Sequence, residues 1–517
     1  MEIPVNVPII IDIGEAYVKI GFAGDKIPRI VFPCMTGTEK YRSIMVDIGE
    51  ARGKMIYVGE DCMKMRGVLK ITYPISRGNI TQWESFYEIL NHIFYNLLRI
   101  NPTEYEVLYS EPINIPKETK EYIARVFFET HRVKKLMMIP SPLLSLFSVG
   151  LTTGLVIECG EGLTNIVPII DGKIFYPAVQ ILTLAGADVS LNLKSLLLRQ
   201  GISLEFSAQK VILREIIEKF CYIALDPSSI NEKVKTEKQS YVLPDGEAIN
   251  IYNESMYLSP EILFQPSILG YNIQSIPEAV INCLGNINSE HWALLLKNIV
   301  VSGGNSSYNG FIERLKAELI TILPNLGPIP AIPETPQIQE RKSLISQEGT
   351  SILQDTCEKC GNLVDLSSGI KICPYCGNTM KTPTIDILLK TGIEKKLQKI
   401  KRKCPHCKKD LPPDSEHLFC PFCGQKIQDL EGQDIKEGQE VHIEEYTEPI
   451  VAIPTYYEDV SELFNFFIPE NKQFAIFLGG SILGSLPSFR KLFINSNQFA
   501  SNPNLLYHDI SEIFKIE

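Results

Sequence analysis

The sequence predicts an α/β protein built from two related halves, with a small cysteine-rich module inserted towards the C-terminal end. Residues 1–326 alternate apolar, β-branched runs with amphipathic helical segments. A run that ends in an acidic-x-glycine turn occurs twice, at Asp12-Ile13-Gly14 and at Glu158-Cys159-Gly160. Eight of the thirteen cysteines lie between Cys357 and Cys423. Short acidic-glycine turns are common by chance, and it is their repetition that favours two related halves facing one another.

The elements of the first region follow from the residue pattern. Apolar runs that end in glycine-rich or acidic turns predict strands, and apolar residues at helical spacing predict helices. The predicted strands are Val7–Ile13, Tyr105–Tyr109, Leu155–Ile157 and Ile299–Val301, and the predicted helices include Trp83–Leu98, Lys117–Glu129 and Ala208–Ala224.

The composition changes after residue 326. Prolines at positions 328, 330, 333 and 336 open an extended linker, which is followed by the cysteine region and an acidic tail. Globular patterning resumes near Ile453, and the segment Phe474–Leu486 begins a helix whose apolar face needs the core built by residues 1–326. We therefore predict three segments: the first part of a two-lobed body at 1–326, an insert at 327–453 and the last part of the body at 454–517.

Composition and charge exclude several classes of protein. The 517 residues are 44% hydrophobic and 21% charged, as in ordinary soluble proteins with several domains or subdomains. With 50 Lys+Arg against 61 Asp+Glu, the net charge of -11 argues against a chain that coats nucleic acid or anionic membrane. The apolar run Val7–Ile11 is cut by Asp12 and no basic region precedes it. We therefore expect no signal peptide, no transmembrane span and a cytoplasmic location.

The insert has the cysteine spacing of two zinc ribbons, at about 357–376 and 404–423. Each unit has two Cys-x2-Cys pairs separated by twelve residues and ends in Cys-Pro-aromatic-Cys-Gly. Two such turns brought together by a hairpin give tetrahedral coordination by four thiolates, which suits Zn²⁺. Redox-active or unligated pairs are the alternative, and the duplicated spacing disfavours them. The predicted zinc ligands are Cys357, Cys360, Cys373, Cys376, Cys404, Cys407, Cys420 and Cys423.

A basic segment, Lys381–Lys409, lies across the start of the second unit. It carries ten Lys/Arg against Asp386 and Glu394. Part of this excess offsets the net charge of roughly -2 on each four-thiolate zinc site. A contact with nucleic acid is an alternative, although only Tyr375 and Phe422 stand in the cysteine turns for base stacking. The pattern favours a structural or protein-binding role over nucleic-acid binding.

A series of short motifs runs through both parts of the body. They include Ile10-Ile11-Asp12-Ile13-Gly14, Lys19-Ile20-Gly21-Phe22-Ala23-Gly24-Asp25, Tyr73-Pro74-Ile75, Gly78-Asn79-Ile80-Thr81-Gln82-Trp83, Leu184-Ala185-Gly186, Leu243-Pro244-Asp245-Gly246, Ser302-Gly303-Gly304 and Gly479-Gly480-Ser481. In sequence and in order, these motifs resemble actin and the actin-related proteins. The resemblance implies an actin-like (ribonuclease H-like) fold of two lobes and four subdomains around a cleft. The zinc module has no counterpart in actin, and it favours an archaeal relative of eukaryotic actin.

The resemblance also implies that the cleft binds ATP or ADP with Mg²⁺. Asp12 matches an aspartate that positions hydrated Mg²⁺, and Lys19 matches a lysine that neutralises phosphate charge. The two glycine turns match hairpins whose backbone amides cradle phosphates. The implied cofactor-binding residues are Gly14, Glu15, Lys19, Gly160, Glu161, Gly162, Gly186, Arg214, Glu218, Gly303, Gly304, Tyr308 and Lys472. The match to the family at Lys472 can shift by one position, to Gln473. The residues at the implied catalytic positions are Asp12, Glu158, Ser141 and Asn165.

Departures from the family pattern predict an ATPase that is slow at most. Where the family has a serine that donates to the terminal phosphate, this chain has Glu15. A carboxylate about 4 Å from a phosphate charge costs a few kcal/mol at an effective dielectric near 20, so Glu15 must turn away, bind a cation or disfavour a triphosphate. Glu158 is longer by one methylene than the family aspartate. Ser141 and Asn165 replace the glutamine and histidine that orient water, and positioning dominates phosphoryl transfer.

Two features weaken the case for self-polymerisation. The insert falls where the third subdomain meets the next protomer in actin filaments, so it should obstruct that contact unless it swings away on its proline linker. Residues 35–54 replace the DNase-binding loop of actin with a different, more polar sequence.

The leading hypothesis is an actin-related protein that binds ATP or ADP with weak or no hydrolysis. It would act as a non-filamentous adapter, capping or regulatory component of a cytoskeletal assembly, and its zinc ribbons would recruit a protein partner such as actin or an actin-like filament. The alternatives are a polymerising cytoskeletal ATPase, a chromatin- or RNA-associated relative that uses Lys381–Lys409, and a small-molecule kinase, for which no acceptor-site base stands out.

Overall fold

The computed structural model describes residues 3–4, 6–40, 56–204, 209–243, 246–330, 354–356, 363–365, 457 and 459–507. The chain divides into two units, one formed by Met1–Met380 with Pro454–Glu517 and the other by Lys381–Ile453. The second unit lies outside the described residues, and every described helix and strand belongs to the first. The predicted boundaries of the insert, 327 and 453, stay a prediction.

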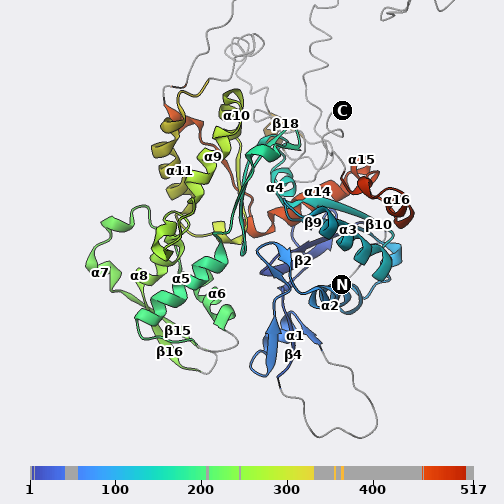
Figure 1. Cartoon of the computed structure of the whole chain (residues 1–517), viewed down its shortest axis with the longest axis horizontal. Helices are drawn as coiled ribbons and strands as arrows, with labels where there is room; N and C mark the ends of the chain where they lie inside the picture. Colours follow the sequence, from blue (N-terminus) through green and yellow to red (C-terminus); the bar gives the residue numbers. More distant parts are fainter. Residues whose placement is uncertain are drawn as a thin grey trace, which may run out of the picture. The chain divides into compact units, whose positions relative to one another are not determined.

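A mixed five-stranded sheet forms the centre of the first lobe, in the order β10-β9-β1-β2-β3 (Figure 1). Its first three strands in sequence form an antiparallel meander, and the last two run parallel to β1. The strands are β1 (Ile9–Ile13), β2 (Tyr17–Phe22), β3 (Ile30–Pro33), β9 (Glu106–Glu111) and β10 (Lys135–Pro140).

The sheet of the second lobe repeats this order as β13-β12-β11-β17-β20. It too begins with an antiparallel meander and adds two parallel strands. The strands are β11 (Gly154–Cys159), β12 (Thr164–Ile170), β13 (Lys173–Ile174), β17 (Ile299–Ser302) and β20 (Phe466–Phe467), and β14 (Gln180–Leu182) also pairs with β12. The repeated turn in the sequence therefore marks a repeated sheet, as predicted.

Helices cover the sheet of the first lobe. α2 (Trp83–Asn91) and α3 (Lys117–Arg125) place Phe86, Ile89 and Ile123 in one core with the strands of that sheet. Both helices continue as π-helical turns, His92–Leu97 and Val126–Thr130. The predicted helices at Trp83–Leu98 and Lys117–Glu129 are thus confirmed in position. The change from α-helix to π-helix at their C-terminal ends was not predicted from the sequence.

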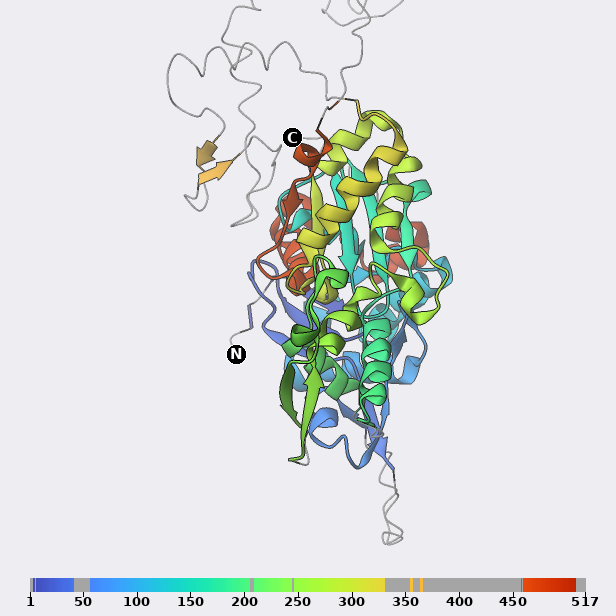
Figure 2. The same ribbon diagram turned by 90° about the vertical axis from the view of Figure 1, so that its left-hand side faces the viewer.

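Helices α5 (Gly186–Arg199), α6 (Gln209–Phe220), α9 (Ile276–Gly285) and α11 (Phe311–Ile322) share one core with the second sheet. Figure 2, which is turned towards this lobe, shows α11 in front of the strands. The predicted helix Ala208–Ala224 was too long: Ala208 lies outside the described residues, and α6 ends at Phe220. The helix stops because the chain turns away, and Ile223 N donates to Asn309 O at 2.9 Å.

Two helices, α4 (Ser141–Phe147) and α14 (Ala475–Ser485), pack against each other and share a core with residues of both sheets. This core contains Ile10 of the first sheet and Val156 of the second. The contact between the helices is close, because a Cβ on Gly479 would overlap the Leu144 carbonyl oxygen. The C-terminal segment thus returns to the core built by the N-terminal part of the chain, as predicted for the helix that begins near Phe474.

Two smaller β structures extend the lobes. β4 (Thr36–Glu39) pairs with β5 (Ile56–Val58) and with β6 (Leu69–Thr72), and β15 (Lys238–Val242) pairs with β16 (Ala248–Tyr252). Residues 41–55, most of the segment predicted to replace the DNase-binding loop, lie outside the described residues. In the insert, β18 (Gln354–Thr356) and β19 (Leu363–Asp365) form an antiparallel pair.

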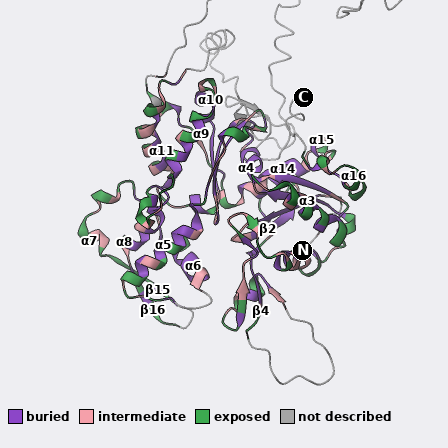
Figure 3. Ribbon diagram, in the orientation of Figure 1, coloured by how far each residue is buried: buried purple, intermediate pink, exposed green. Residues whose placement is uncertain are grey.

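Burial follows this arrangement. The strands of both large sheets are mostly buried, and the exposed residues gather on the outer helices and loops (Figure 3). None of the described helices is both long enough and apolar enough to cross a membrane. The five cysteines that the structure describes, Cys34, Cys62, Cys159, Cys221 and Cys283, are buried and form no disulfide.

Candidate functional site

A cavity of about 1280 Å³ opens between the two lobes, where the β1–β2 turn faces the β11–β12 turn. Every residue that the sequence predicted for the catalytic and cofactor-binding sites lines this one cavity. These are Asp12, Gly14, Glu15, Lys19, Ser141, Glu158, Gly160, Glu161, Gly162, Asn165, Gly186, Arg214, Glu218, Gly303, Gly304, Tyr308 and Lys472. The structure brings them together; the role of each stays a prediction.

The two turns have the same geometry. Gly14 N donates to Tyr17 O at 3.1 Å, and Gly160 N donates to Leu163 O at 2.9 Å. In the first hairpin Asp12 is paired with Lys19, and at the same position of the second hairpin Glu158 is paired with Asn165. Each turn therefore places a glycine at the cavity, with a buried carboxylate two residues before it.

The Asp12 carboxylate is buried and held on both oxygens. Ser110 Oγ donates to Oδ1 at 2.6 Å, and Lys19 Nζ donates to Oδ2 at 2.8 Å. This gives the cavity a fixed oxygen donor beside a cation, which is the chemistry expected where hydrated Mg²⁺ accompanies phosphates.

Glu158 is buried and accepts three side-chain hydrogen bonds. The donors are Ser141 Oγ at 2.9 Å, Ser145 Oγ at 3.2 Å and Asn165 Nδ2 at 3.4 Å. Burial, with the nearby Asp12 charge, raises the pKa of Glu158 to about 7. Sequence reasoning missed Ser145, although its position four residues after Ser141 on α4 places both hydroxyls on one helix face.

Glu15 does not turn away from the cavity. Its carboxylate lies between the two turns: Arg77 N donates to Oε2 at 2.8 Å, and Lys210 Nζ lies 3.9 Å from Oε1. A Cβ on Gly162, in the opposite turn, would overlap this carboxylate. Burial raises the pKa of Glu15, and the Lys210 charge opposes that rise. Of the three predicted outcomes for Glu15, the geometry excludes the first, because the carboxylate points into the cavity and lies beside a cation.

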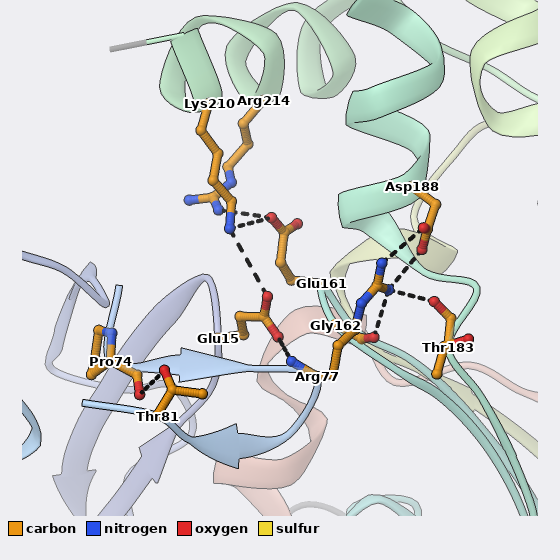
Figure 4. A network of polar contacts seen from close by, with 10 residues as sticks. All are labelled: Glu15, Pro74, Arg77, Thr81, Glu161, Gly162, Thr183, Asp188, Lys210 and Arg214. Carbon is orange, nitrogen blue, oxygen red and sulfur yellow. Dashed lines mark hydrogen bonds and ion pairs between the residues drawn. The ribbon is translucent and has the colours of Figure 1, made fainter. Parts of the chain in front are cut away.

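Arg77 joins the two lobes, and sequence reasoning gave it no role (Figure 4). It lies in the turn between β7 (Ile75–Ser76) and β8 (Asn79–Ile80) of the first lobe. Its guanidinium donates to both oxygens of Asp188 at 2.7 and 2.8 Å, to Gly162 O at 3.0 Å and to Thr183 O. The sequence signal that could have identified Arg77 is its position directly before Gly78, which begins one of the motifs that resemble actin.

Charged residues of α6 line the far side of the cavity. Arg214 donates to Glu161 at 3.2 Å and its guanidinium lies 5.1 Å from the Tyr17 ring centroid. Lys210 Nζ lies 3.4 Å from the same Glu161 oxygen. Burial raises the pKa of Glu218. These contacts fix the carboxylate of Glu161 beside the second turn.

The remaining predicted residues form the floor of the cavity. Gly303 has a φ of 89°, and a Cβ there would overlap the Cys159 carbonyl, so glycine is required at this close approach. Lys472 donates through Nζ to Ser306 O at 2.8 Å, and its carbonyl accepts from Gly303 N. Lys472 is therefore anchored in the cavity, and Gln473 lines it as well.

Two amide side chains of the cavity have a buried atom without a hydrogen-bond partner. Among the described residues, neither Asn165 Oδ1 nor Asn305 Nδ2 has one. An unsatisfied buried polar atom costs about 1–3 kcal/mol. These two atoms fit a polar ligand that enters the cavity with both donors and acceptors, as a nucleotide does.

Metal ligands of the zinc type are not found in the part of the chain that the structure describes, where no group of three or more His, Cys, Asp or Glu side chains could hold a metal. All the predicted zinc ligands lie outside the described residues. They are Cys357, Cys360, Cys373, Cys376, Cys404, Cys407, Cys420 and Cys423.

Comparison with known proteins agrees with the duplicated sheet and its cavity. Residues 4–356 match the family model described as Actin. The chain is 33% identical over 317 residues to actin-related protein 2 of Arabidopsis thaliana, a match that covers 60% of this chain and 80% of that protein. The family match ends directly before Cys357, the first predicted zinc ligand.

Proposed function

This chain belongs to the actin family, and on that premise we propose that its cavity binds ADP or ATP with Mg²⁺ and that hydrolysis is slow or absent. The observation that carries the proposal is the pair of equivalent glycine turns facing one cavity. Backbone amides in such turns are suited to phosphate oxygens. Bound Mg²⁺ would shield the charge of those oxygens.

The chain's own residues have distinct parts in this proposal. Asp12, held by Ser110 and Lys19, supplies a fixed carboxylate towards a hydrated cation. The unpartnered amide atoms of Asn165 and Asn305 supply hydrogen bonds to a polar ligand. Ile217 lines the cavity where the family has a lysine on the adenine side.

The hydrogen bonds of Glu158 support slow hydrolysis. Ser141 and Asn165 occupy the positions of the family's water-orienting residues, and both donate to the Glu158 carboxylate. The Ser141 hydroxyl hydrogen and one Asn165 amide hydrogen are therefore used within the protein. These two side chains would place a water molecule differently from the glutamine and histidine of the family. Because positioning of the nucleophile dominates phosphoryl transfer, this arrangement favours weak catalysis.

We further propose that the protein acts in the cytoplasm as a non-filamentous adapter, capping or regulatory component of a cytoskeletal assembly. The support is the sequence of the insert: two sets of four cysteines with equal spacing, which suit Zn²⁺, on a proline-rich linker. A chain with such an insert gains a separate surface for a protein partner.

Calorimetry tests the nucleotide proposal. Wild-type protein is titrated with MgADP and with MgATP, beside Asp12→Asn and the matched control Glu237→Gln, whose side chain is exposed and away from the cavity. We expect one nucleotide per chain, an affinity reduced by about tenfold or more in Asp12→Asn because the cation loses a charged partner, and no change in the control.

Phosphate release is measured on the same samples. No binding of either nucleotide to the wild type would contradict the assignment of the cavity, and a burst of phosphate release on the timescale of seconds would contradict slow hydrolysis.

A further inference from the structure

The Glu15 carboxylate occupies space between the two glycine turns. It extends from the β1–β2 turn until it lies against Gly162 of the β11–β12 turn, where any side chain would overlap it. Arg77 N fixes its orientation with a hydrogen bond of 2.8 Å (Figure 4). An anionic group of the protein therefore already lies between the two turns.

The charges around Glu15 are balanced within the protein. Arg77 pairs with Asp188 at 2.7 Å, and Arg214 pairs with Glu161 at 3.2 Å. Lys210 lies 3.4 Å from Glu161 and 3.9 Å from Glu15. Three cations thus meet three carboxylates in this cluster, and the positive charge beside Glu15 is already paired within the protein.

The same contacts hold the two lobes together. Glu15 and Arg77 belong to the first lobe, whereas Gly162, Asp188 and Lys210 belong to the second. The Arg77–Asp188 ion pair and the Glu15–Lys210 approach therefore cross the cavity (Figure 4). Closure of the lobes at this point needs no phosphate to bridge the turns, because the protein's own carboxylate does so.

We propose that Glu15 is a built-in substitute for the terminal phosphate of a nucleotide, so that the cavity selects nucleoside diphosphates over triphosphates. This inference rests on the proposed nucleotide binding and specifies the class of nucleotide. A carboxylate and a phosphate are both anionic hydrogen-bond acceptors, and two anions at contact distance in a partly buried site repel each other strongly. A diphosphate ends before this position and avoids the repulsion.

The test is the ratio of MgADP to MgATP affinity, measured by calorimetry on the full chain. Glu15→Ser removes both the charge and the volume, Glu15→Gln removes the charge alone, and Glu237→Gln is the control for loss of an exposed carboxylate. We expect wild type and control to prefer MgADP. In Glu15→Ser the relative affinity for MgATP rises by about tenfold or more, and in Glu15→Gln it rises less, because the longer side chain still fills the space.

The outcomes separate this inference from the proposed function. An unchanged ratio in both variants would overturn the role of Glu15 while nucleotide binding stands. Loss of MgATP affinity in Glu15→Ser would show that Glu15 supports a triphosphate through its cation, which also overturns the inference. If neither nucleotide binds to wild type or to either variant, the proposed function fails, and the inference fails with it. Thermal unfolding of each variant confirms that it is folded.

Discussion

His131 is a buried side chain that makes stability depend on pH. It is 2% exposed, lies beside the rings of Phe94 and Tyr95, and neither ring nitrogen has a hydrogen-bond partner among the described residues. Burial lowers its pKa from 6.5 to about 4, because nothing compensates the lost hydration of the charged ring. The unfolded chain therefore binds a proton more readily than the folded one.

We predict that His131 destabilises the fold as the pH falls from about 6.5 to about 4, and that its effect is absent above 6.5. His131→Phe, which keeps a ring in the same space, should retain more stability at pH 4.5 than wild type, by on the order of 2 kcal/mol. Melting temperatures across this range check the prediction, with the half-exposed His291→Gln as control. Parallel curves for wild type and His131→Phe would show that His131 does not contribute.

At the scale of residues, motif resemblance predicted which side chains meet in the cavity but not which ones touch. Glycines and carboxylates in turns carry a local signal, so Asp12, Gly14 and Gly160 could be named in advance. Arg77 and Lys210 could not, because their contacts with Asp188 and Glu15 cross between lobes and depend on the tertiary fold. The spacing of residues within a helix or strand predicts which side chains of that element are neighbours. It carries no information about the side chains of the facing lobe.

At the scale of elements, the close packing of α14 on α4 depends on glycine. A Cβ on Gly479 would overlap the Leu144 carbonyl, which is backbone and cannot rotate away. We predict that Gly479→Ala destabilises the protein by roughly 3 kcal/mol, since overpacking a core forces the backbone to shift. Unfolding in denaturant measures the effect. Gly67→Ala is the matched control, because a Cβ at Gly67 meets nothing within 4 Å. Equal stability of the two variants would contradict this view of the helix contact.

Elements were predictable where the pattern is local. The strands containing Ile11, Leu108 and Val156 each have three or four consecutive apolar or aromatic residues, and the sequence places them correctly. The end of α6 was not predictable, because it is set by the bond from Ile223 to Asn309, in a segment far along the chain. Apolar periodicity continues past Phe220 although the helix does not.

At the scale of the whole molecule, two similar sheets place two similar turns face to face across one cavity. The duplication was visible in the sequence as two acidic-x-glycine turns. The cleft between them was predicted from the resemblance to the actin family. The contacts that join the lobes, Arg77 with Asp188 and Glu15 with Lys210, emerged only from the structure. They support the proposal that closure of this cavity does not rely on a terminal phosphate.

The most direct test of a nucleotide-binding but non-filamentous actin-family protein is sedimentation of the full-length chain with Mg-ATP and with Mg-ADP. It is compared with a variant that lacks residues 331–453 and keeps Ile329, which is buried in the core of the second lobe. We predict that the full-length protein stays in the supernatant with either nucleotide, as expected if the insert obstructs contacts between protomers. If only the variant pellets, the insert prevents filament formation. If neither protein pellets, the surfaces of the body prevent it. Filaments of the full-length protein in the pellet would contradict the non-filamentous role and establish a polymer-forming member of the family.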